Sequence, residues 1–110
     1  MPRFGVAEIE QPSGTVTFLF SDIEGSTPLW DRHHDEMRAA TARHDAILQG
    51  VINARGGYVF TTAGDEFAAA FPRAADAIEA AIGIQAALAA EPFPATTPIR
   101  VRMGLHSGVA

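Results

Sequence analysis

Two short acidic segments contain the residues best suited to chemistry. One is residues 20–27, with the sequence FSDIEGST, and the other is residues 63–67, with the sequence AGDEF. Each places an aspartate, Asp22 or Asp65, at the end or the tip of an apolar, strand-like run, where the backbone holds a carboxylate in place and leaves it open to solvent. Carboxylate oxygens are ligands that Mg²⁺ prefers in proteins. If folding brings the two aspartates together, they form a site for divalent metal.

The first segment also contains groups that suit an oligophosphate. Residues 24–27 turn from strand into helix, so their backbone N–H groups, helped by the helix dipole, can face phosphate oxygens beside Asp22. Two ions about 3.5–4 Å apart can bridge two carboxylates and such a phosphate chain. A pair of this kind lowers the pKa of an attacking hydroxyl and neutralises a leaving pyrophosphate. The residues alone therefore indicate a two-metal phosphotransfer site.

The composition limits the class of protein. The chain has 110 residues, of which 47% are hydrophobic, enough for one small globular domain with one core. Its net charge is −5, and with only 8 Lys and Arg it lacks the basic footprint of a protein that binds nucleic acid or anionic lipid. It has no Cys, which excludes disulfides and thiolate metal sites, and no apolar run long enough for a bilayer. We expect a cytoplasmic protein with no membrane segment and no nucleic-acid partner.

The apolar pattern predicts four strands and two helices in the order β-α-β-β-α-β. Residues 1–13 are expected to form a flexible lead-in. This order predicts an α+β fold with a ferredoxin-like βαββαβ palm core, an antiparallel sheet that carries both helices on one face. The expected elements are a strand at 15–20, a helix from about 26 to 56 with a break near Asp31, strands at 58–62 and 66–71, a helix from Pro72 to about 90, and a strand at 99–105. In such a fold the end of the first strand and the hairpin between the second and third strands can be neighbours.

Local signals predict the helix ends and faces. Ser26 or Thr27 is expected to cap the first helix, because a hydroxyl can accept a hydrogen bond from a free N–H group there. Gly64 permits the positive φ of a tight hairpin. The residues expected on the buried face of the second helix are Ile78, Ala81, Ile82 and Leu88.

Three segments resemble those of class III adenylate and guanylate cyclase catalytic domains. Residues 17–27 (TFLFSDIEGST) look like that family's opening signature, residues 56–67 (GGYVFTTAGDEF) resemble its second segment, and residues 102–108 (RMGLHSG) are similar to its next strand motif. The three motifs occur in order, and the resemblance runs from about Thr15 to Ala110. It is strongest to the actinobacterial type of domain, which often occurs in multidomain regulators.

The resemblance implies a reaction and a set of functional residues. Asp22 and Asp65 are implied to be the catalytic pair that binds two Mg²⁺ or Mn²⁺ ions, with the carbonyl of Ile23 as a further ligand. The implied reaction is in-line attack of a ribose 3′-hydroxyl on the α-phosphate of ATP or GTP, giving pyrophosphate and a cyclic nucleotide, cAMP in preference to cGMP. The implied assembly is a homodimer with its active sites at the subunit interface. The residues implied to contact the nucleotide are Glu24, Gly25, Ser26, Thr27, Thr61 and Gly64.

Two departures from the family pattern bear on activity. Members with adenylate specificity often carry Lys four residues before the second aspartate, where this chain has Thr61. The family's domain also continues beyond the strand at 99–105, and its later part supplies a second base-selecting residue and an Asn and an Arg that stabilise the transition state. We therefore expect residues 14–110 to be the N-terminal part of a cyclase domain, weak or inactive alone.

Two other functions fit part of the pattern. Residues 63–67 are similar to the Gly-Gly-Asp-Glu-Phe turn of diguanylate cyclases, but the helix after Asp22 lacks the Phe-Lys and Asn-Asp pairs expected there in that family. A non-catalytic module that binds a nucleotide or only dimerises is the second alternative, and Thr61 favours it. Arg100 and Arg102 can approach phosphate from the last strand, but we expect them to be solvated, as most strand arginines are.

Overall fold

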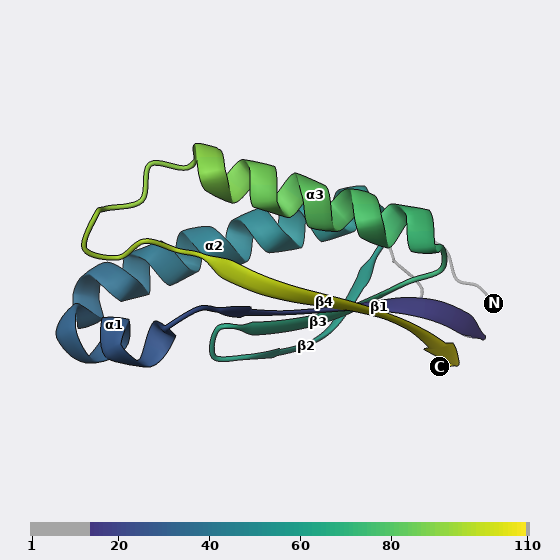
Figure 1. The fold of residues 1–110 in the computed structure, drawn as a ribbon, viewed down its shortest axis with the longest axis horizontal. Coiled ribbons are helices and arrows are strands. Elements are labelled where there is room, and N and C mark those ends of the chain that lie inside the picture. Colours follow the sequence, from purple (N-terminus) through teal and green to yellow (C-terminus); the bar gives the residue numbers. More distant parts are fainter. Residues whose placement is uncertain (1–13, 110) are drawn as a thin grey trace, which may run out of the picture.

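The protein is a four-stranded antiparallel sheet with two long helices on one of its faces (Figure 1). The computed structural model describes residues 14–109, so the predicted lead-in at residues 1–13 lies outside the described residues. The strand order is β2-β3-β1-β4, which confirms the predicted ferredoxin-like arrangement. The elements are β1 (Thr15–Ile23), α1 (Ser26–Arg32), α2 (His34–Ala54), β2 (Tyr58–Ala63), β3 (Glu66–Phe71), α3 (Ala74–Ala90) and β4 (Val101–Val109).

The central strand β1 is three residues longer than predicted, and this extension positions Asp22. Its last residues pair with β4, with Asp22 opposite Arg102 and Ile23 opposite Val101. Main-chain hydrogen bonding to β4 outweighs the weak strand propensity of a polar residue. Side chains alternate between the two faces, so that Leu19 and Ile23 pack under the helices while Phe20 points away from them. The same alternation puts Asp22 on the face without helices.

The hairpin between β2 and β3 is as tight as predicted. Ala63 pairs with Glu66, which leaves Gly64 and Asp65 as a two-residue loop, and Gly64 has a φ of 62°. A positive φ at the first loop position is the conformation for which glycine is favoured. The pairing register shifts between Val59 and Thr61, so the strand bulges at Phe60.

The first predicted helix consists of two helices, and its N-cap differs from the prediction. The break predicted near Asp31 is at His33, two residues later, between α1 and α2. Neither Ser26 nor Thr27 caps α1 through its side chain, because Gly25 takes the N-cap position with a φ of 65°. The chain reverses direction sharply after β1, and glycine adopts the left-handed conformation that this reversal requires at little cost.

The predicted buried face of α3 is wrong at two of its four positions. Ile78 and Ile82 are 49% and 62% exposed, whereas the fully buried isoleucine is Ile84. The helix is apolar nearly all round, so periodicity does not identify its inner face. Small residues instead decide the packing: a Cβ at Gly83 would lie 3.2 Å from Val51 of α2. The residues of α3 that are buried are Ala77, Ala80, Ile84 and Leu88.

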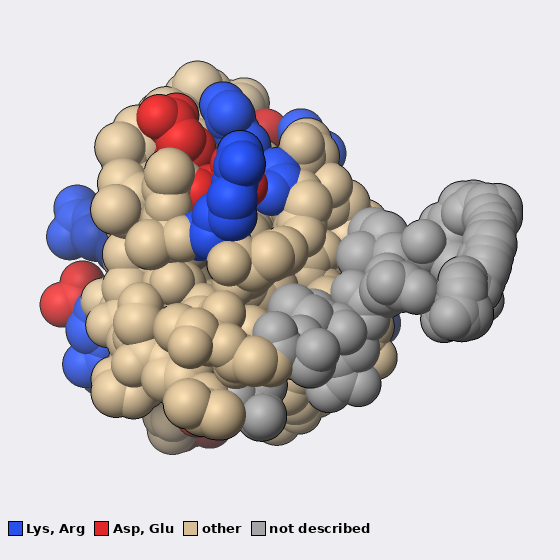
Figure 2. Space-filling model, turned by 90° about the vertical axis from the view of Figure 1, so that its right-hand side faces the viewer, with Lys and Arg blue, Asp and Glu red and all other residues tan. Residues whose placement is uncertain are grey.

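The end of the helical layer where α2 ends and α3 begins carries paired charges. Figure 2 views the molecule from its right-hand side in Figure 1, and acidic and basic side chains stand together there above a largely uncharged lower part. Arg73 and Asp76 are 3.3 Å apart, and Arg55 and Glu79 are 3.7 Å apart. Within residues 14–109, no helix combines the length and the apolar character needed to cross a membrane.

Candidate active site at the end of the central strand

The structure brings the two predicted aspartates into one cleft. Asp22 is the penultimate residue of β1, and Asp65 is in the β2–β3 loop. Since β3 lies beside β1, with Phe67 opposite Ser21, the tip of the hairpin reaches the end of β1. The backbone N–H of Ile23 donates a hydrogen bond of 3.0 Å to Oδ2 of Asp65. The cleft has a volume of about 340 Å³ and is lined by Asp22, Ile23, Gly25, Ser26, Thr27, Pro28, Asp65, Glu66 and Arg102.

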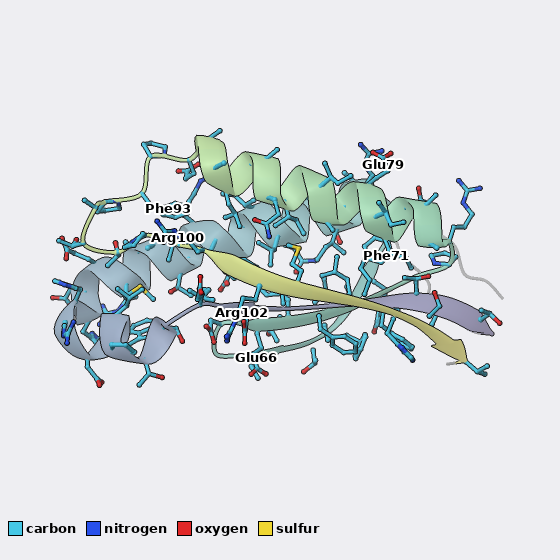
Figure 3. All side chains as sticks on the ribbon, viewed as in Figure 1. Glu66, Phe71, Glu79, Phe93, Arg100 and Arg102 are labelled. Atoms are coloured by element: carbon cyan, nitrogen blue, oxygen red, sulfur yellow. The ribbon has the colours of Figure 1, made fainter. Side chains whose placement is uncertain are left out.

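Arg102 lies on the last strand and is largely exposed, as predicted, but its contact with Asp22 was not predicted. Its Nε donates to Oδ1 of Asp22 and its Nη2 to Oδ2, each at 2.9 Å, so the guanidinium holds the whole carboxylate in a two-pronged contact. Hydrogen bonding to Asp22, followed by the attraction of that carboxylate and more weakly of Glu24 and Asp65, raises the pKa of Arg102 above its usual value. In Figure 3, Arg102 lies near Glu66 at the side of the sheet away from the helices.

The contact between Arg102 and Asp22 could have been predicted only from the register between β1 and β4. An arginine on an edge strand is usually solvated, and only the pairing of Asp22 with Arg102 across β1 and β4 places the two side chains on one face of the sheet. Arg100, two residues earlier, is outside β4 and lines a different pocket near Phe93 and Gln85. Figure 3 shows Arg100 nearer to the connection from α3 than to Arg102's neighbour Glu66.

The other predicted nucleotide-contacting residues fall into separate groups. Gly25, Ser26 and Thr27 line the cleft. Glu24 and Gly64 do not line it, and the backbone N–H of Glu24 already donates to the carbonyl of Arg100 at 2.7 Å. The predicted backbone contact from Glu24 therefore lacks a free donor, which narrows the predicted phosphate-binding turn to residues 25–27.

Thr61 lies in a second hollow next to the cleft. This pocket has a volume of about 560 Å³ and occupies the face of the sheet without helices. It shares Asp22, Glu66 and Arg102 with the cleft, so the two spaces lie against the same side chains. Its walls are mostly apolar and include Phe20, Phe60, Phe67 and Met103. Together the two spaces offer a charged end and an apolar end, as a nucleoside phosphate requires.

The comparisons with known proteins identify the family. The sequence model of the adenylate and guanylate cyclase catalytic domain matches residues 8–110. The chain belongs to this family. An uncharacterised protein of Mycobacterium tuberculosis is 41% identical to this cyclase-family chain over 99 residues, covering 88% of the chain and 32% of that relative. The adenylate cyclase of Lachancea kluyveri is 38% identical over 87 residues, covering 79% of the chain and 5% of that relative.

A solved structure supports the same assignment. An adenylate cyclase of Trypanosoma brucei in its monomeric state matches with a TM-score of 0.83 at 26% identity, covering 91% of this chain and 58% of that one. The cyclase-family chain thus spans about a third of its mycobacterial relative and little more than half of the solved domain. The family match does not favour the diguanylate cyclase alternative.

The cleft of this cyclase-family chain fits a divalent metal that is shared with a phosphate. Asp22, Asp65 and Ile23 all line it, and the backbone N–H of Ile23 holds the carboxylate of Asp65. Among residues 14–109 no group of three or more His, Asp or Glu side chains is placed to hold a metal. Mg²⁺ typically takes one or two carboxylates and completes its shell with water and substrate phosphate. The two-carboxylate set therefore suits Mg²⁺ or Mn²⁺ bound together with an oligophosphate.

Proposed function

We propose that this chain carries the metal- and phosphate-binding part of a nucleotidyl cyclase, which forms a cyclic nucleotide and pyrophosphate from a nucleoside triphosphate. The observation that carries the proposal is the meeting of Asp22 and Asp65 in one cleft, where Ile23 donates to Asp65 at 3.0 Å. Membership of the cyclase family supports the reaction type. The similarity to adenylate cyclases supports ATP as the substrate and cAMP, rather than cGMP, as the product.

In this proposal the two aspartates and the Ile23 carbonyl hold two Mg²⁺ or Mn²⁺ ions. Bound there, such ions activate the ribose 3′-hydroxyl and neutralise charge on the leaving pyrophosphate. The chain itself fixes the geometry: β1 presents Asp22, the hairpin presents Asp65, and the hydrogen bond from Ile23 locks the two elements together. Rigid placement of both carboxylates lowers the entropic cost of in-line attack on the α-phosphate.

The remaining cleft residues position the nucleotide. Residues 25–27 present backbone to the triphosphate at the turn into α1, and Gly25 leaves that approach free of a side chain. Arg102 supplies the positive charge that the acidic cleft otherwise lacks, and its planar fork suits phosphate. Thr61 lines the larger, mostly apolar pocket beside the cleft, where it is available for a base.

The assembly is also part of the proposal. The face of the sheet without helices exposes Phe20 and Phe60, and covering such aromatic surface is a common driving force for association. We propose a homodimer in the cytoplasm with active sites at its interface. Residues 14–110 would then be the N-terminal part of a larger catalytic domain, which agrees with the share of the solved domain that the chain covers. Later residues would complete the transition-state contacts.

The test is nucleotide binding and turnover in matched aspartate variants. Binding of ATP and of GTP is measured by calorimetry in Mn²⁺ and in EDTA, and cyclic product is assayed in the same samples. Asp22→Asn and Asp65→Asn should each abolish Mn²⁺-dependent binding. Asp35→Asn is the control, because Asp35 is an exposed aspartate at the start of α2 that lines neither the cleft nor its pocket.

Each result has a distinct meaning. Metal-dependent binding with weak or no turnover fits a chain that binds the substrate but lacks later transition-state groups. Binding that does not depend on metal favours the non-catalytic module. If both cleft variants bind nucleotide as well as the Asp35 control does, the proposed site is wrong.

A further inference from the structure

Arg102 and a metal ion require the same oxygens of Asp22. Both carboxylate oxygens already accept hydrogen bonds from the guanidinium at 2.9 Å. A metal ion bound to Asp22 takes at least one of these oxygens and places a divalent charge next to the guanidinium. The two cations therefore cannot occupy Asp22 in the same way at the same time.

Arg102 is free to leave the carboxylate. Its side chain is 64% exposed and that of Asp22 is 35% exposed, so the guanidinium can swing into water without unfolding the strand. In the described part of the chain, its ion pair is with Asp22 alone, although Glu24 and Asp65 lie close enough to attract it. An ion pair between such exposed side chains contributes little to stability, so a ligand that binds the guanidinium more strongly can break it.

A triphosphate would be such a ligand. Guanidinium groups bind phosphate with the same two-pronged geometry that they use for carboxylate, and phosphate carries more charge. Arg102 lines both the cleft and the adjoining pocket, so a nucleotide in either space can reach it.

We propose that Arg102 acts as an internal counter-cation that occupies Asp22 until a triphosphate draws it away, so that triphosphate binding makes Asp22 available to metal. The two ligands are then thermodynamically coupled: each one favours the other because both act against the Arg102–Asp22 contact. This inference rests on the proposed function, since it assigns Asp22 to the metal. It adds that the cleft binds metal more weakly without a triphosphate than with one.

The first test measures Mn²⁺ affinity without nucleotide, from the free Mn²⁺ signal in electron paramagnetic resonance. Arg102→Ala should bind Mn²⁺ about two- to fivefold more tightly than the wild type, which is the effect of releasing an exposed ion pair. Arg102→Lys keeps the charge but loses the fork and should lie in between. Arg100→Ala is the control for net charge, because Arg100 lines another pocket, and it should match the wild type.

The second test follows the guanidinium itself in EDTA, where no metal is present. The Nε–H signal of Arg102, assigned by its loss in Arg102→Lys, is observed by nitrogen-15 NMR while inorganic tripolyphosphate is added. The chemical shift of the Arg102 Nε–H should change, and the carboxyl carbon shift of Asp22 should change as its hydrogen bonds to Arg102 are lost. A saturating amount of tripolyphosphate that leaves both signals in place would overturn the coupling.

The outcomes separate this inference from the proposed function. If Asp22→Asn abolishes Mn²⁺ binding but Arg102→Ala binds Mn²⁺ no better than the wild type, the counter-cation role is wrong and the proposed function stands. Equal gains in Arg102→Ala and Arg100→Ala would show a general effect of charge and would also overturn the inference. If Asp22→Asn retains full Mn²⁺ affinity, the proposed function itself fails.

Discussion

The two faces of the sheet differ in what they contribute to the protein. On the face under the helices, Leu19 and Phe71 are completely buried and belong to one core with residues of α2 and α3. On the opposite face Phe20 and Phe60 are each more than 40% exposed. Phe18 packs against both of them, with its ring centroid 6.1 Å from that of Phe20 and 6.0 Å from that of Phe60.

This difference separates stability from function. The free energy of folding comes mainly from apolar area removed from water, and the described residues bury that area under α2 and α3. The open face is where Asp22, Arg102 and the pocket beside them lie. A sheet that is stabilised from one side can place charged and exposed groups on the other at little cost to stability. Substitutions on the two faces should therefore have different kinds of effect.

The largest expected contrast is between two adjacent residues of β1. Leu19→Ala should lower the free energy of unfolding by about 2–5 kcal/mol, because it leaves a cavity in the helix–sheet core. Phe20→Ala removes a larger side chain, yet should cost about 1 kcal/mol or less, since Phe20 is 45% exposed. Urea unfolding followed by circular dichroism measures both values. Equal losses would mean that the open face is as tightly packed as the covered one.

The features that were predictable from the sequence are those with a local pattern. Alternating apolar residues identified β1, and the Gly64–Asp65 loop identified the hairpin, so the convergence of Asp22 and Asp65 followed from the order of elements. The position of Arg102 did not follow, because it depends on the register between strands 80 residues apart, which no local signal specifies. The extension of β1 to Ile23 was missed for the same reason.

The inner face of α3 was unpredictable for another reason. When nearly every position of a helix is apolar, the hydrophobic pattern does not show which face of the helix is buried. The face that packs is then the one whose small residues allow the closest approach, here Ala77 and Ala80, both fully buried. Ile78 and Ile82 lie on the outer side of α3, although an isoleucine is more hydrophobic than the two alanines that are buried.

A matched pair on α3 sharpens the comparison between covered and open surfaces. Ile84→Ala should lower the free energy of unfolding by about 2–4 kcal/mol, because Ile84 is fully buried. Ile82→Ala changes the same side chain two residues away and should change stability by about 0.5 kcal/mol or less. Thermal unfolding of the two variants side by side gives the difference directly. If Ile82→Ala lowered the free energy of unfolding more than Ile84→Ala did, the buried face predicted from the sequence would be the correct one.

The smallest effect concerns self-association through the open face. Phe60 is at the bulge of β2 and belongs to the exposed aromatic group, so a second copy that covers this face would bury it. Phe60→Ala should raise the dimer dissociation constant about tenfold, the effect expected for an aromatic anchor, with little loss of folding stability. Sedimentation velocity over a range of concentrations measures this shift.

Ile82→Ala is the control for that measurement. Ile82 is more exposed than Phe60, at 62% against 42%, but it lies on the helical side of the molecule. If exposed apolar area alone drove association, Ile82→Ala would have the larger effect. If the open face is the contact surface, only Phe60→Ala weakens the dimer, and the nucleotide pocket that Phe60 lines becomes part of the interface. An unchanged dissociation constant in both variants would place any self-association elsewhere and leave the open face to the nucleotide alone.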